Sequence, residues 1–154
     1  MRTFLIILLA LTGCNKAVVQ GKDRPIQPIS RSFAASVDET FEAAKKSLRL
    51  NDYEIQKENS EEKTVVTEWM PTKATSHYTE VFGEKDYGTI GAYFHLRLKV
   101  QERDGKAEVQ ITAPVRSLAG YQRSTYREEK KIFKKIADLL RSDSFKMTNL
   151  GVEE

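Results

Sequence analysis

The one cysteine and the two histidines of this sequence, Cys14, His77 and His95, are the first residues to consider for covalent or acid–base chemistry. A thiolate can act as a nucleophile or metal ligand, and an imidazole exchanges a proton near neutral pH. A catalytic histidine also needs a nucleophile and an orienting acid, and no motif in the chain suggests either. Both histidines are therefore expected to be solvated, with His95 on the polar side of a strand and His77 in a loop. The sequence predicts no catalytic residue, metal ligand or cofactor.

Composition narrows the possible classes of function further. A single cysteine excludes an internal disulfide framework and any metal site made of cysteines alone. The phosphate-binding, dinucleotide-binding, zinc-protease and serine-hydrolase signatures are missing from the sequence. The net charge of +3 comes from 25 basic and 22 acidic residues, an excess too mild to indicate nucleic-acid binding. A chain of 154 residues fits one compact domain with a core of its own.

The position of Cys14 gives that cysteine a more specific interpretation. It follows Arg2 and an uninterrupted apolar run over residues 4–11, which is far shorter than the roughly 20 residues of a bilayer-spanning helix. Such a run is typical of a signal peptide. The sequence Leu-Thr-Gly-Cys that ends at Cys14 resembles the lipobox of bacterial lipoproteins. The alternative is a buried cysteine at the start of a short core helix.

The lipobox resemblance implies both a membrane anchor and a cellular location. It implies that residues 1–13 are removed as a signal peptide and that Cys14 is acylated, which attaches the chain firmly to a membrane. Asn15, instead of aspartate, favours the outer membrane by resemblance to proteobacterial sorting. Residues 14–30 are polar and contain Pro25 and Pro28, and we interpret them as a tether that reaches at most about 50 Å. The expected location is the cell envelope, facing the periplasm.

The first half of the remaining chain predicts a strand, a helix and a hairpin. Residues 29–35 are typical of a short strand, and Ser36 with Glu39 has the spacing of a capping box that begins a helix reaching residue 50. Residues 53–59 and 64–70 are two strand-like runs that flank a charged turn. Trp69 falls on the same face as buried positions of the second run, so it is expected to pack in the core. Ligand stacking is the alternative role.

The second half begins with the clearest pattern in the sequence. Apolar residues alternate with polar ones over residues 90–102, which predicts one continuous strand with a single buried face. A turn over residues 103–106 leads into a partner strand over residues 107–113. A last helix is predicted over residues 125–142, with Thr125 and Glu128 at capping-box spacing. Residues 143–154 show little pattern and are interpreted as a tail.

These elements follow in the order β-α-β-β-β-β-α. The expected fold class is α+β, an antiparallel sheet with two helices packed on one face, over residues 31–142. The stretch FAASVDETFEAAKKSLRLNDYEIQKENSEEKTVVTEW, with the long hairpin and closing helix after it, resembles the helix-grip domains of BamC lipoproteins. That family belongs to the machinery that assembles β-barrels in the outer membrane. The resemblance implies a helix-grip fold and a role in envelope assembly.

Two segments contain aromatic and basic residues that packing does not readily explain. Residues 72–89 are too long for a hairpin turn, although part of this segment could simply extend the neighbouring strands. Residues 115–127 interleave arginines with tyrosines beside the last helix, and the alternative there is a solvated loop with one packing tyrosine. Tyr and Arg are the residue types most often found as interface anchors. The candidate partner-binding residues are Tyr78, Phe82, Tyr87, Arg116, Tyr121, Arg123 and Tyr126.

Three functions are compatible with this sequence. The first is a non-enzymatic, membrane-anchored module that binds an envelope protein. The second is a lipid or glycolipid carrier, because helices that grip a sheet can enclose a cavity. The third is an envelope hydrolase. The predicted core residues are large and aliphatic, which favours a filled interior and therefore the first function.

Overall fold

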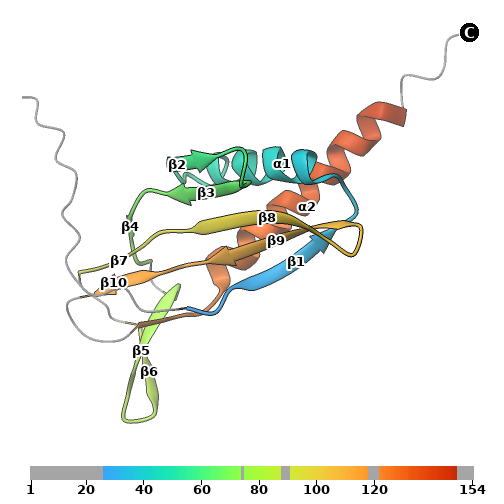
Figure 1. Cartoon of the computed structure of the whole chain (residues 1–154). Helices are drawn as coiled ribbons and strands as arrows, with labels where there is room; N and C mark the ends of the chain where they lie inside the picture. The colour runs from blue at the N-terminus through green and yellow to red at the C-terminus, as the bar shows by residue number, and fades with distance from the viewer. Residues whose placement is uncertain (1–25, 74, 88–90, 118–121, 149–154) are drawn as a thin grey trace, which may run out of the picture.

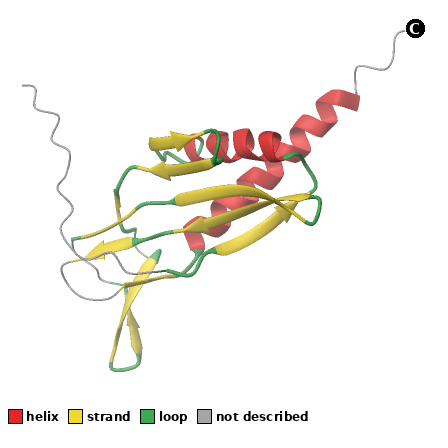
Figure 2. Cartoon of the chain, in the orientation of Figure 1, coloured by secondary structure: helices red, strands yellow, loops and turns green. Residues whose placement is uncertain are grey.

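The computed structural model describes residues 26–73, 75–87, 91–117 and 122–148. These residues form antiparallel sheets and two helices, so the predicted α+β fold class is confirmed. Helices α1 (Val37–Arg49) and α2 (Arg127–Thr148) lie behind the largest sheet in the view of Figures 1 and 2. The strands are β1 (Ile29–Phe33), β2 (Ile55–Asn59), β3 (Thr64–Thr67), β4 (Met70–Pro71), β5 (His77–Val81), β6 (Glu84–Asp86), β7 (Ala92–Phe94), β8 (Arg97–Arg103), β9 (Lys106–Thr112), β10 (Val115–Ser117) and β11 (Gln122–Ser124).

The largest sheet has five antiparallel strands in the order β1-β9-β8-β3-β2. Strands β8 and β9 form its central hairpin, in which Arg97 lies opposite Thr112 and Arg103 lies opposite Lys106. Asp104 and Gly105 turn this hairpin with φ of 53° and 71°. Positive φ at both positions is the geometry of a type I′ turn, which asparagine, aspartate and glycine adopt most readily. The predicted turn is therefore confirmed.

The core lies between this sheet and the two helices. Alternate residues of β8 and β9 point toward the helices, and the apolar stripes of α1 and α2 cover them. The side chains that are at most 2% exposed include Phe41, Ala44, Leu48, Leu96, Leu98, Val100, Val109, Ile111, Ile132 and Ile136. Apolar side chains therefore line the space between sheet and helices.

The strand predicted over residues 90–102 is interrupted. Strand β7 ends at Phe94, and β8 begins only at Arg97. At the break, the amide of Leu96 donates to the side-chain hydroxyl of Thr67 at 2.9 Å. This hydroxyl takes the place of the backbone carbonyl that would accept the bond in a continuous pair of strands. The two halves consequently join different sheets, since β7 pairs with β10 and β4. The alternation of apolar residues in the sequence continues across the break, which is why the sequence pattern did not reveal it.

The start of α1 agrees with the sequence prediction. The hydroxyl of Ser36 accepts a hydrogen bond from the amide of Glu39 at 3.2 Å, and the Glu39 carboxylate accepts one from the amide of Ser36 at 3.0 Å. Hydrogen bonds from Ser36 favour the ionised carboxylate and lower the pKa of Glu39. This capping box fixes the point at which the chain leaves β1 and enters the helix.

The second capping box, predicted for Thr125 and Glu128, is wrong. The hydroxyl of Thr125 donates to the carbonyl of Thr75 at 2.9 Å, and Glu128 accepts a hydrogen bond from another side chain. Helix α2 begins at Arg127 and continues to Thr148, into the segment that the sequence pattern left as a tail. Within the described part of the chain, neither helix has the length and apolar character that a membrane span requires.

Candidate binding surface

Strands β5, β6 and β11 form a separate three-stranded sheet, here called the finger sheet. It joins the two segments that the sequence proposed separately as partner-binding regions. Arg123 on β11 lies directly opposite Tyr78 on β5, and Thr79 lies opposite Asp86 on β6. In Figure 1 the β5–β6 hairpin projects away from the body of the domain. Residues from two distant parts of the sequence therefore share one protruding surface.

The outward face of the finger sheet contains aromatic and charged side chains. The rings of Tyr78 and Tyr87 have their centroids 5.9 Å apart. The ammonium of Lys85 lies 4.9 Å from the centre of the Tyr78 ring, within cation–π range. Arg123 Nη1 forms an ion pair of 3.1 Å with Glu80 Oε2. This combination of tyrosine, arginine and lysine offers both apolar area and hydrogen-bonding groups to a partner.

Phe82 occupies the tip of the hairpin and is fully exposed, with a relative accessibility of 103%. Val81 pairs with Glu84, so Phe82 and Gly83 are the two central residues of the turn. Their φ values of 50° and 85° place both in the left-handed region. Glycine adopts this region freely, whereas a bulky aromatic residue is a rare occupant and is strained by about 1–2 kcal/mol. A strained, exposed phenylalanine contributes nothing to folding that the structure shows.

The inward face of the finger sheet attaches it to the domain. His77 is 1% exposed, and its ring packs against Phe94 with a centroid distance of 4.9 Å. The hydroxyl of Ser124 donates to the buried carboxylate of Glu129 at 2.9 Å. The amide of Thr125 donates to the carbonyl of Ser76 at 2.9 Å. The base of the hairpin is thus fixed in the core while its tip is free of it.

His77 was expected in solvent, and the structure corrects that prediction. Desolvation by burial lowers its pKa to about 4, and the nearby negative charge of Glu128 offsets this only in part. The neighbouring Tyr53 hydroxyl donates to Glu128 at 2.6 Å, and burial raises the pKa of Tyr53 well above its usual value. Burial also raises the pKa of Glu129. A neutral imidazole at this position behaves as a packing residue at neutral pH.

Ser76 and His77 are hydrogen-bonded to each other, which raises the question of a catalytic pair. The Ser76 hydroxyl lies 2.9 Å from His77 Nδ1, yet both residues are 1% exposed. The same hydroxyl donates to the carbonyl of Lys73 at 2.8 Å and accepts from the Lys73 amide at 3.0 Å. Because these bonds hold the hydroxyl in a turn and solvent does not reach it, the pair stabilises the start of β5. Among the described residues, no three histidine, cysteine or acidic side chains are grouped as metal ligands.

Arg116 belongs to a different cluster from the finger sheet. It lies on β10, and its guanidinium carbon is 4.7 Å from the centre of the Trp69 ring. His95 belongs to the same cluster. Its ring packs edge-on against Trp69 with the ring centroids 4.1 Å apart, and its Nε2 accepts a hydrogen bond from Arg97 Nε at 2.8 Å. His95 is 3% exposed, which corrects its predicted solvation. Trp69 is half-buried and outside the core, because the chain leaves the largest sheet after Thr67.

The remaining candidate residues lie either outside the finger sheet or outside the described residues. Tyr126 is half-buried immediately before α2, with φ of 60°, and its amide donates to the Ser124 hydroxyl at 2.9 Å. Tyr121 and Cys14 lie outside the described residues. Of the seven proposed partner-binding residues, Tyr78, Phe82, Tyr87 and Arg123 therefore come together on one surface.

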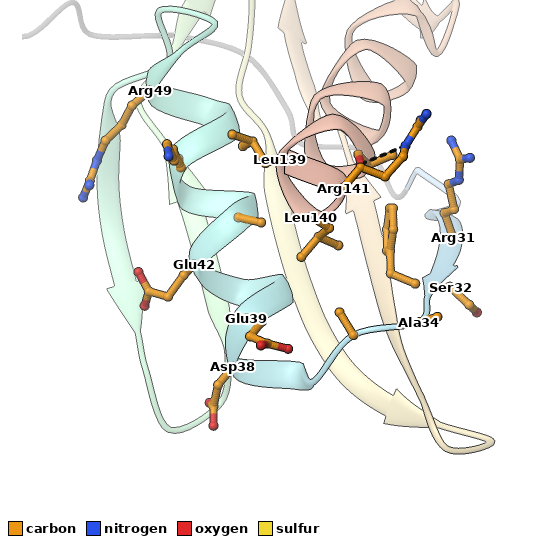
Figure 3. A pocket seen from close by; sticks show the side chains of 15 residues that line it. Arg31, Ser32, Ala34, Asp38, Glu39, Glu42, Arg49, Leu139, Leu140 and Arg141 are labelled. Atoms are coloured by element: carbon orange, nitrogen blue, oxygen red, sulfur yellow. Dashed lines mark hydrogen bonds between the residues drawn. The ribbon is translucent and has the colours of Figure 1, made fainter. Parts of the chain in front are cut away.

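A groove at the opposite end of the core was not anticipated from the sequence. It has a volume of about 1040 Å³ and opens between β1, α1 and the second half of α2 (Figure 3). Its apolar floor includes Phe33, Ala34, Ala43 and Leu140, and charged side chains from β1 and both helices surround it. Ala43 on α1 and Ala137 on α2 line the groove, and small residues in helices normally indicate close helix packing.

Comparison with known proteins leaves the function of this chain open. No protein-family model matches the sequence, and no curated protein matches it. Among solved structures, the crystal structure of Ara h 8.0201 superposes with a TM-score of 0.38 and 11% sequence identity. That superposition covers 75% of this chain and 97% of the other. A likeness of this size assigns no ligand, so the function has to be argued from the residues themselves.

Proposed function

We propose that this protein is a membrane-anchored, non-enzymatic module that binds an envelope protein through the finger sheet. The lipobox at Cys14 supports the anchor, and the resemblance to BamC supports a role in envelope assembly. The observation that carries the binding proposal is Phe82, which is fully exposed and strained at the tip of a hairpin. Strained residues that the fold does not need are found at functional sites.

The geometry explains how such a surface would bind. The buried contacts of His77 and Ser124 hold the base of the finger sheet, so presenting Phe82 requires little additional ordering. Binding energy concentrates in a few aromatic and arginine anchors that enter pockets of a partner. Phe82 would be the central apolar anchor, with Tyr78 and Arg123 beside it. The expected partner is therefore a protein with an apolar pocket and a polar rim.

Site-specific photo-crosslinking in native membranes tests this proposal. A photoreactive phenylalanine analogue at position 82 should capture one envelope protein, since this side chain projects from the finger. The matched control is the same analogue at Ser60, an exposed residue in the turn between β2 and β3. A product of equal yield from both positions would indicate random collision and would contradict the proposal.

A further inference from the structure

In the groove between β1, α1 and α2, the acidic residues have bonding partners, whereas most of the basic residues have no ion-pair partner among the described residues. Three acidic residues line it, and all three are engaged elsewhere. Asp38 pairs with Lys63 at 2.6 Å and Glu42 with Lys45 at 2.6 Å, and neither lysine lines the groove. The third, Glu39, is the acceptor of the α1 capping box. Two of the three carboxylates are therefore compensated by a lysine, and the third is held as an ionised group in the capping box.

Within the same described ranges, most of the basic residues of the groove lack such partners. Four basic residues line it: Arg31, Lys46, Arg49 and Arg141. Arg141 pairs with Asp138 at 3.5 Å, and the other three have no ion-pair partner among the residues that the structure describes. Arg31 lies with its guanidinium carbon 5.7 Å from the centre of the Phe33 ring, and Phe33 belongs to the groove floor. Figure 3 shows Arg31 beside the opening, on the β1 side, and Leu140 between it and α1. The groove thus combines an apolar floor with uncompensated positive charge.

We propose that this groove binds a single-chain amphiphile with an anionic head group. The acyl chain would lie on the floor formed by Ala34, Ala43 and Leu140, and the head group would lie beside Arg31. Ligand sites of this kind occupy about 300–1,000 Å³, are mostly apolar and contain a few placed charges. The site is an open groove between the sheet-edge strand β1 and both helices, and the core residues Phe33 and Ala43 contribute to its lining. This inference is independent of the function proposed for the finger sheet.

A fluorescent fatty acid, dansyl-undecanoate, is a suitable probe for this site. The full chain carrying Cys14→Ser, which removes the predicted acylation, should bind the probe at one site and release it to palmitate or lysophosphatidylglycerol. Ala34 is exposed, so Ala34→Trp should fill the groove without disturbing the core and weaken probe binding at least tenfold. The control is Ser60→Trp, which adds the same ring at an exposed turn and should leave binding unchanged.

The charge argument has its own variant. Arg31→Glu should weaken palmitate binding at least fivefold and leave uncharged monopalmitoylglycerol unaffected, whereas Lys57→Glu on exposed β2 should change neither. Phe82→Asn should also retain binding, since it alters only the finger sheet. Unchanged affinity in Ala34→Trp, equal losses in the controls, or uptake of many probe molecules per chain would overturn the proposal. Loss in Phe82→Asn alone would move the site to the finger sheet and overturn it equally.

Discussion

Replacing Phe82 by asparagine should make the protein more stable and weaken its binding to the proposed envelope partner at least tenfold. Phe82 is fully exposed, so its removal sacrifices no contact within the fold. Its φ of 50° costs a bulky residue about 1–2 kcal/mol, and asparagine tolerates this region much better. With Gly83 at the next position, the substitution creates Asn-Gly, the preferred pair for a type I′ hairpin turn. We expect a gain of about 0.5–1 kcal/mol in the free energy of unfolding.

This prediction separates a binding residue from a structural one. Urea unfolding of the parent and Phe82→Asn chains measures the stability difference, and thermal unfolding should show a rise of about 3 °C. Capture of the partner identified by crosslinking should fall at least tenfold, equivalent to about 1.4 kcal/mol. The matched control is Asp104→Asn in the Asp104-Gly105 turn between β8 and β9. Aspartate already tolerates positive φ at that position, so this substitution should change stability little. A less stable Phe82→Asn chain, or one that retains its partner, would refute the reasoning.

Three further predictions concern the anchor, the core and the pH dependence. Cys14→Ser should block lipidation and leave an uncleaved or soluble precursor, and a variant that still fractionates with membranes after carbonate washing would contradict the lipobox interpretation. Leu96→Ala should reduce the unfolding free energy by about 2–5 kcal/mol and Lys99→Ala by less than about 0.5, measured by urea unfolding; equal effects would mean that the strand faces are reversed. His77 takes up a proton near pH 6.5 in the unfolded chain but only near its pKa of about 4 in the folded chain. The free energy of unfolding therefore decreases as the pH is lowered from 6.5 to 4. This residue alone should lower stability by about 3 kcal/mol between pH 7 and 4, and His77→Gln should remove that part of the pH dependence.

The fold was largely predictable because its signals are local. The capping box of Ser36 and Glu39, the turn at Gly105 and the alternation along β8 each depend on residues a few positions apart. Burial of alternate residues then determined which face of the sheet the helices cover. The interruption at Leu96 could not be predicted in this way, since its cause is the hydroxyl of Thr67 in another strand.

The binding surface was predictable only as residue types. Tyrosines and arginines in irregular segments indicated Tyr78, Phe82 and Arg123, but not that they share one sheet. The burial of His77 also depended on distant contacts, with Phe94 and with the segment that leads into α2. The groove could not be predicted because its net charge depends on which charged residues form ion pairs. Asp38, for example, pairs with Lys63, which lies in the distant turn between β2 and β3.

The end of the domain at which β1 begins has a consequence for how strong the binding has to be. In Figure 1, β1 starts at the end from which the β5–β6 hairpin projects, so residues 14–30 would hold this hairpin near the membrane. With Cys14 lipidated as proposed, a tether of at most about 50 Å would confine the hairpin to a thin layer above the bilayer. Within such a volume, a partner in the same membrane meets it at an effective concentration in the millimolar range. Under the proposed anchoring, a contact too weak to survive purification would still form in the membrane, and covalent capture is the experiment suited to find it.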